Sequence, residues 1–204
     1  MFQDSLIGVL LLITHILSCL TVGFIFRFWK RNKTIKNSSP HYNFNSADIN
    51  ISNLGEILST SIISSIKTIL LIGGFVVLFS VILSLLNESG FMKIICYFCF
   101  PLFDLFGMNK MDFSNGFFSG VLEVTNGLNI ISNINIKHIS CNIIISSFIL
   151  GFGGLSVLLQ VYSIISKSNI SIKPYIIGKL LHGIIASIYT FIFIYTIPIF
   201  NLNL

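Results

Sequence analysis

The chain of 204 residues is 54% hydrophobic and only 9% charged, with a mean hydropathy of +0.91. Soluble domains carry roughly 25% charged residues, so a water-soluble fold could not bury this much apolar side chain. A spanning helix needs about 20 mainly apolar residues, so the length allows about six membrane segments and no separate soluble domain. We therefore expect an all-α, multi-pass protein of the cell membrane.

The net charge of +5 comes largely from basic residues that directly follow the first apolar stretch. These residues are Arg27, Lys30, Arg31, Lys33 and Lys36. Basic residues at this place suit membrane topology and anionic lipid, and no basic stripe interleaved with aromatic residues occurs. We expect membrane lipid as a partner and no nucleic acid.

Four cysteines lie inside apolar runs, where they behave as small hydrophobic residues: Cys19, Cys96, Cys99 and Cys141. Cys96 and Cys99 match C-x-x-C in letters only, because a second ligand pair for zinc and a βαβ context for redox chemistry are both missing. No phosphate-binding loop, zinc protease motif or nucleophile elbow occurs. We expect no enzymatic activity, no metal and no cofactor.

The first apolar run extends from Ser5 to Trp29, too long for the hydrophobic part of an ordinary signal peptide. We interpret residues 1–29 as a retained transmembrane helix. The basic residues follow it, so the positive-inside rule places the N-terminus outside and Lys30 onward in the cytoplasm. Residues 30–53 are polar and rich in Asn and Ser, which predicts a cytoplasmic linker.

A membrane domain is predicted over residues 54–204. From Leu54 to Ile69, apolar residues recur at helical spacing with polar residues on other faces, which predicts an amphipathic helix in the cytoplasmic interface. This helix leads directly into Thr68 to Leu86, an uncharged run long enough to span.

Two shorter apolar runs follow, of 16 residues from Phe91 to Phe106 and of 15 residues from Phe117 to Ile131. They predict re-entrant or discontinuous helices, with a break at Pro101; the alternative is a pair of short, tilted spans. Ile139 to Ile165 and Tyr175 to Phe200 are long enough to span. We therefore expect about four full spanning helices and two short helices, with both termini outside.

Glu123 is the only acidic residue at the centre of an apolar run, where burying a carboxylate costs at least a few kcal/mol. On one continuous helix, small and polar residues share a face with it: Gly116, Ser119, Gly120, Asn126 and Gly127. This stripe indicates a substrate, ion or proton site, with Glu123 as ligand or proton carrier and Thr125 and Asn126 beside it. The alternative is an interfacial segment whose polar face meets lipid headgroups.

Three glycines, Gly151, Gly153 and Gly154, fall within four residues of a long apolar run and predict a break in the helix. A helix that restarts near Leu155 would point its free N–H groups and the positive end of its dipole into the membrane. The face that follows carries hydrogen-bonding groups: Gly153, Ser156, Gln160 and Ser163. The alternative is that these glycines serve close packing alone.

His182 lies two turns after Pro174, with Lys179 three residues before it. We expect Lys179 to snorkel toward the cytoplasm and His182 to lie deeper. His182 is either a satisfied histidine with a packing role or part of a proton pathway. The sequence indicates no partner for His15.

Four segments in this order resemble one known family: Leu54 to Ser80, Gly120 to Gly127, Gly151 to Gln160 and Lys179 to Gly183. Together they are similar to the C-terminal half of the sporulation integral membrane protein YlbJ family, over Leu54 to Tyr189. The resemblance implies a nucleoside-recognition, or Gate, domain, which is similar to parts of concentrative nucleoside transporters. It implies a substrate site lined by Glu123, Asn126, Gly153, Ser156 and Gln160.

The same resemblance implies a role in endospore formation, specifically spore cortex assembly. Family members are usually about twice this length, and an inverted-repeat transporter needs both halves to enclose its site. We therefore expect a homo-oligomer, a separate N-terminal half or a truncated product. The alternatives to the sporulation role are a secondary transporter subunit for a nucleoside or similar small polar solute and a non-transporting membrane scaffold.

Overall fold

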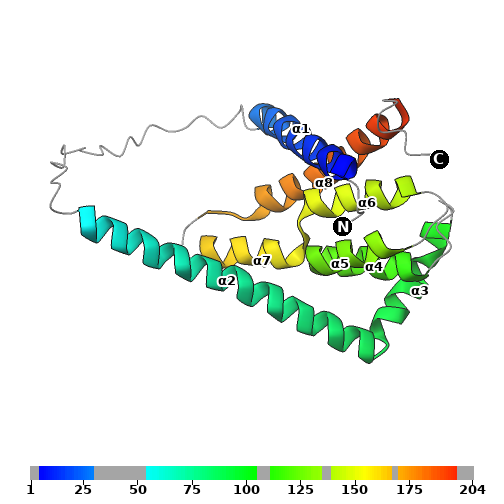
Figure 1. Cartoon of the computed structure of the whole chain (residues 1–204), viewed down its shortest axis with the longest axis horizontal. Coiled ribbons are helices and arrows are strands. Elements are labelled where there is room, and N and C mark those ends of the chain that lie inside the picture. The colour runs from blue at the N-terminus through cyan, green and yellow to red at the C-terminus, as the bar shows by residue number, and fades with distance from the viewer. Residues whose placement is uncertain (1–4, 30–53, 105–110, 135–138, 167–169, 197–204) are drawn as a thin grey trace.

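The computed structural model describes residues 5–29, 54–104, 111–134, 139–166 and 170–196, without the side chains of residue 29 and residues 99–104. The described residues form eight α-helices and no strand (Figure 1). These helices are α1 (Ser5–Trp29), α2 (Leu54–Glu88), α3 (Phe91–Asp104), α4 (Met111–Leu122), α5 (Val124–Asn133), α6 (Ile139–Phe152), α7 (Gly154–Ile165) and α8 (Lys173–Thr196). The predicted all-α class is confirmed. The predicted linker at 30–53 lies outside the described residues.

Four segments of the described chain are long and apolar enough to cross a membrane. They are α1, α2, the α6–α7 segment and α8. The predicted set of about four spanning helices is therefore confirmed, and the protein is a multi-pass membrane protein. In Figure 1, α1 and α8 lie on one side of the layer formed by α4 to α7, and α2 lies on the other side.

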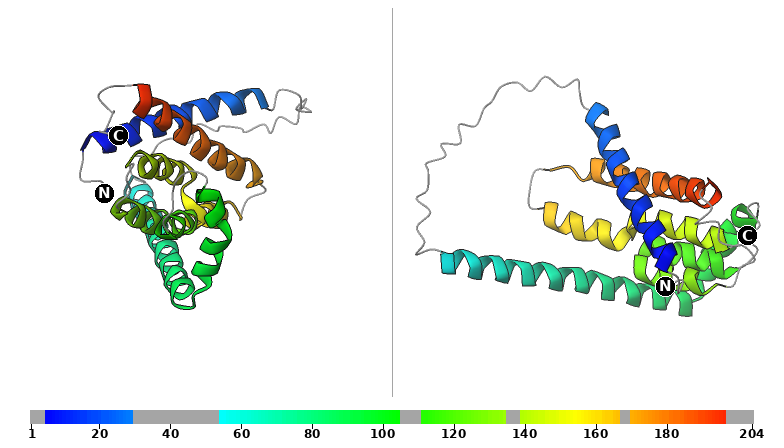
Figure 2. Two further views of the ribbon diagram at one scale, coloured as in Figure 1. Left: turned by 90° about the vertical axis from the view of Figure 1, so that its right-hand side faces the viewer. Right: turned by 45° about the horizontal axis from the view of Figure 1, so that its top comes forward.

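Helix α2 is a single helix of 35 residues, about 52 Å long at 1.5 Å per residue. Figure 2 shows it as one long rod without a sharp bend. The predicted interfacial segment and the predicted span are thus joined in one helix, longer than a hydrocarbon core of about 30 Å. Part of α2 therefore projects beyond the core, and the interfacial placement of its first turns stays a prediction.

The break predicted at Pro101 is wrong, because α3 continues through this residue to Asp104. Pro101 lies in the last turn of α3, where it removes one helical hydrogen bond without dividing the helix. The run from Phe117 to Ile131 is divided instead, between α4 and α5 at Glu123. The short apolar runs therefore become three helices of 14, 12 and 10 residues.

Helices α4 and α5 form an antiparallel hairpin whose glycines let the two backbones touch. A Cβ atom added to Gly127 would lie 2.0 Å from the Cα atom of Gly120 and 2.8 Å from the carbonyl oxygen of Gly116. One turn further from the bend, a Cβ atom added to Gly116 would lie 2.7 Å from the Cγ1 atom of the Ile131 side chain. Only hydrogen fits at Gly127, so this glycine sets how closely the arms of the hairpin pack.

The predicted break in the long helix is confirmed at Gly153, which separates α6 from α7. Gly153 has φ +80° and Gly154 has φ +76°, a backbone region that residues with a side chain rarely adopt. Helix α7 begins at Gly154, one residue before the predicted restart near Leu155.

Helices α1, α6 and α8 pack together around a buried hydroxyl group. The Oγ1 atom of Thr190 lies 2.7 Å from the Oγ atom of Ser147 and 3.2 Å from the Oγ1 atom of Thr14, so one residue of α8 links both neighbours. A Cβ atom on Gly151 would lie 2.8 Å from the Cα atom of Gly183, which brings α6 and α8 into backbone contact. Small and hydroxyl residues hold helices together in this way inside membranes.

We expect the substitution Gly127→Ala to destabilise the fold by about 3 kcal/mol, because its methyl group would overlap the Gly120 backbone. Unfolding in mixed detergent micelles measures this loss. Gly73→Ala is the matched control, since nothing lies within 4 Å of a Cβ atom there. Equal stability of the two variants would contradict the close packing of the hairpin.

Candidate functional site

Four helix ends meet where the tip of the α4–α5 hairpin contacts the break between α6 and α7. A Cβ atom on Gly154 would lie 3.2 Å from the carbonyl oxygen of Gly120, 3.3 Å from that of Leu122 and 3.4 Å from the amide nitrogen of Val124. We call this region, residues 122–126 with residues 151–156, the junction.

Helix lengths place the junction about halfway along the broken α6–α7 segment. Helices α4, α5 and α6 have 12, 10 and 14 residues, or about 15 to 21 Å each. Helix α7 continues from the break for 12 residues, about 18 Å. No single one of these four helices reaches the roughly 30 Å that a hydrocarbon core requires.

Glu123 caps the first turn of α5 with its own side chain. Its backbone is extended, with φ −142° and ψ 119°, and its side chain is 1% exposed. The two carboxylate oxygens accept hydrogen bonds from the amide of Thr125 at 3.1 Å, the amide of Asn126 at 2.8 Å and the hydroxyl of Thr125 at 2.6 Å. These bonds satisfy N–H groups that have no partner inside the helix.

The predicted continuous polar stripe around Glu123 is therefore wrong, because Glu123 lies at a break between two helices. Its predicted neighbours Gly120 and Gly127 still face each other, now across the hairpin. A role for Glu123 as ligand or proton carrier stays a prediction.

Asn126 connects the hairpin tip to α2. Its Nδ2 atom donates a hydrogen bond to the Oγ atom of Ser80 at 2.9 Å. Thr125 is exposed, and its hydroxyl is used by Glu123. Of these two predicted site residues, only Asn126 bonds another element of the described chain.

The first two turns of α7 carry two buried polar side chains that bond each other. Gln160 donates through Nε2 to the Oγ atom of Ser156 at 3.3 Å, one turn apart. Gly153 occupies the N-cap position and offers no side chain to the first amides of α7. The junction therefore contains three of the predicted site residues, Gly153, Gly154 and Ser156. Gln160 lies one turn beyond it.

Lys179 reaches the junction from α8, although the sequence indicated a side chain that snorkels to the cytoplasm. Its Nζ atom donates to the carbonyl oxygen of Gly151 at 3.3 Å, and a Cβ atom on Gly153 would lie 3.3 Å from the same Nζ atom. The last carbonyls of α6 lack helical partners, and a positive charge there complements the helix dipole. A lysine within an apolar helix was the signal in the sequence for this contact.

The side chain of His182 faces α1 and takes no part in the junction. Its Nε2 atom lies 3.1 Å from the carbonyl oxygen of His15, and the two rings lie 4.5 Å apart. Only its backbone approaches the predicted site, because a Cβ atom on Gly151 would lie 3.0 Å from the His182 carbonyl oxygen. The structure thus supplies the partner of His15 that the sequence did not indicate.

A polar cavity of about 190 Å³ opens between α2 and the hairpin. It is lined by Ser80, Leu83, Ser84, Asn87, Ser119, Asn126, Asn129 and Ile130. Of these polar residues, Ser119 and Asn126 belonged to the predicted polar stripe, and the others had no predicted role in binding. The signal was present at the helical spacing of Ser80, Ser84 and Asn87 within α2. Within the described ranges, no group of three metal-binding side chains occurs.

We expect Lys179→Met to loosen the break while leaving the rest of the fold intact, because the Gly151 carbonyl oxygen loses its partner. A loss of about 1.4 kcal/mol would speed hydrogen exchange of the amides after Gly153 about tenfold. Lys173→Met, at the exposed start of α8, is the control and should leave this exchange unchanged. Identical exchange in both variants would show that Lys179 does not hold the break.

Comparison with known proteins gives one informative match. No family model and no solved structure matches the chain. The chain is 33% identical over 201 residues to the "Sporulation integral membrane protein YlbJ" of Bacillus subtilis (strain 168), covering 92% of this chain and 48% of that relative. The chain thus spans about half the length of this curated relative. Similarity across nearly all of its own length shows that this multi-pass membrane protein belongs to the YlbJ family.

Proposed function

We propose that the chain is a non-enzymatic membrane protein of endospore formation that acts in spore cortex assembly through a transporter-like Gate fold. The name of its relative supports the link to sporulation. The observation that carries the fold is the junction, where the hairpin tip of α4 and α5 contacts the glycine break between α6 and α7.

Helix ends that meet in the middle of a membrane segment cost free energy unless their backbone groups find partners. Backbone groups at helix ends need partners, and the hydrocarbon core offers none. Membrane proteins accept irregular backbone at this depth where it lines a cavity or is buried in protein, and many transporters bind solutes at such broken helices. The arms of the hairpin are too short to span, which supports a re-entrant hairpin that enters and leaves on one side.

The lining of the neighbouring cavity favours an uncharged polar solute. Hydroxyl and amide side chains line it, and none of its lining residues is charged. Such groups donate and accept hydrogen bonds, as a nucleoside or a similar small polar molecule does. Asn126 belongs to both the junction and this cavity, so it would couple solute binding to the hairpin tip.

We expect deletion of the gene to lower heat-resistant spore counts and cortex thickness, and the wild-type gene to restore both. Complementation with Asn126→Ala should restore them poorly, because this change removes the bond to Ser80 and a group that lines the cavity. Ser65→Ala is the matched control, since among the described residues its exposed hydroxyl bonds only the carbonyl oxygen of Ser61 in its own helix. Unchanged spores after deletion would overturn the sporulation role.

The same variants separate a solute site from a scaffold when purified protein is tested with radiolabelled uridine as the probe nucleoside. A solute site predicts uridine binding by wild type and by Ser65→Ala, with a clear loss in Asn126→Ala. If Asn126→Ala forms normal spores in an otherwise sensitive assay and wild type binds no uridine, the scaffold alternative replaces the transporter-like proposal.

A further inference from the structure

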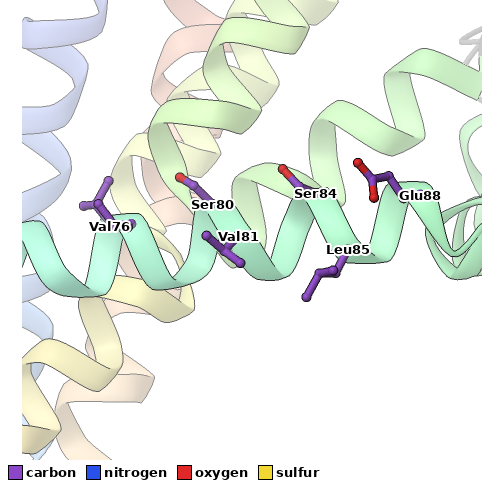
Figure 3. A pocket seen from close by; sticks show the side chains of 7 residues that line it. Val76, Ser80, Val81, Ser84, Leu85 and Glu88 are labelled. Carbon is purple, nitrogen blue, oxygen red and sulfur yellow. The ribbon is translucent and has the colours of Figure 1, made fainter.

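The ionisable side chains of the spanning segments differ in their distance from the helix ends. Glu88, the last residue of α2, is exposed beside a surface groove (Figure 3). His15, Lys179 and His182 instead lie within α1 and α8, where these two helices pack together. His182 is 7% exposed, and the other two side chains are partly buried. We call these three residues the basic cluster. Ionisable groups inside membrane segments are rare and commonly mark a path for protons or ions.

The hydrogen bond of His182 determines which of its ring nitrogens carries a hydrogen atom. Its Nε2 atom lies 3.1 Å from the carbonyl oxygen of His15. A carbonyl oxygen can only accept, so Nε2 carries the hydrogen and donates it. Within the described part of the chain, no hydrogen bond uses the Nδ1 atom of His182. The Nδ1 atom of the neutral ring therefore has a free lone pair, and it is the atom that can take up a proton.

The titratable groups around His182 are themselves basic or neutral. The His15 ring lies 4.5 Å away, and Lys179 is one turn earlier on α8. Cys19 of α1 lies near Lys179, and α6 approaches His182 through the backbone of Gly151. Among the described residues, none of the groups whose charge acts on the basic cluster is a carboxylate. A proton on His182 therefore adds a second positive charge beside the Lys179 ammonium without a negative charge to offset it.

Repulsion between these two charges should displace Lys179 and leave His182 in place. The bond from His182 to the His15 carbonyl becomes stronger when the ring is charged, because charge-assisted hydrogen bonds are the stronger class. Lys179 bonds the Gly151 carbonyl oxygen at 3.3 Å, a long hydrogen bond, through a flexible four-carbon stem. The Lys179 ammonium is thus the group that can move away at the lower cost.

We propose that His182 is a proton-binding site, and that proton uptake at its Nδ1 atom releases Lys179 from the Gly151 carbonyl and loosens the break at Gly153. The proton comes from water and adds to the Nδ1 lone pair, so the ring changes from neutral to singly positive. The junction would then respond to pH through α8. This inference goes beyond the proposed function, because it rests on the contacts of the basic cluster and on no property of a solute.

Two measurements on the full chain in lipid nanodiscs test this proton site together. Nitrogen NMR of the histidine rings follows proton uptake directly, and the contact with the His15 ring identifies the His182 signal. Hydrogen exchange, corrected for its intrinsic pH dependence, follows the amides after Gly153. Between about pH 8 and pH 5, the Nδ1 atom of His182 should gain a proton. Exchange after Gly153 should accelerate over the same range, by up to about tenfold, as expected for Lys179→Met.

Two variants separate the pH response from a purely structural role. His182→Gln keeps an amide that can donate to the His15 carbonyl but cannot take up a proton, so its exchange after Gly153 should stay slow throughout this pH range. Lys179→Met should exchange fast at every pH. If His182→Gln fails to fold, the titration of the unaltered chain still decides.

A His182 ring that stays neutral down to about pH 5 would overturn the proposal. Proton uptake that leaves exchange after Gly153 unchanged would overturn it equally. Neither measurement depends on spore counts or uridine binding, so the proton site and the proposed function fail separately.

Discussion

The need to satisfy helix ends away from water shapes the centre of this protein. Where a helix breaks inside a membrane segment, its free amides and carbonyls need partners that hydrocarbon does not provide. At the junction, Glu123 caps the start of α5 and Lys179 bonds the Gly151 carbonyl at the end of α6. At the far end of the hairpin, Asn142 donates to the Ile131 and Ile134 carbonyls at the end of α5. Side chains thus satisfy several of the groups that the short helices leave without helical partners.

Glycine residues give the helix ends the space to approach one another at the junction. Gly127 lets the hairpin close, and Gly154 lets its tip contact the break in the α6–α7 segment. The result is a set of helix ends fixed next to a cavity that Asn126 and Ser80 help to line. Fixed backbone dipoles beside neutral hydrogen-bonding groups suit recognition of a small polar solute, which is why the proposed function rests on this region.

The sequence predicted features that depend on composition and local backbone, and missed those that depend on tertiary contacts. The lengths of the apolar runs predicted the spanning segments. The glycines from Gly151 to Gly154 predicted the break, because a positive φ angle costs little free energy only for glycine. The break at Glu123 was missed, since its neighbours fit a continuous helix equally well by spacing. The hydrogen bond from Lys179 to Gly151 joins residues that lie far apart in the chain, and so does the cavity between α2 and α5. The periodicity of a sequence gives no information about such long-range contacts.

The depth of the hairpin tip in the bilayer tests the central claim most directly. Nitroxide labels at Met111, Thr125 and Asn133, which are all exposed, would mark the start of α4, the tip and the end of α5. A re-entrant hairpin predicts that the Thr125 label lies near the bilayer centre, while the Met111 and Asn133 labels lie near one and the same surface. A Thr125 label as shallow as the Asn133 label, or Met111 and Asn133 labels at opposite surfaces, would contradict the account.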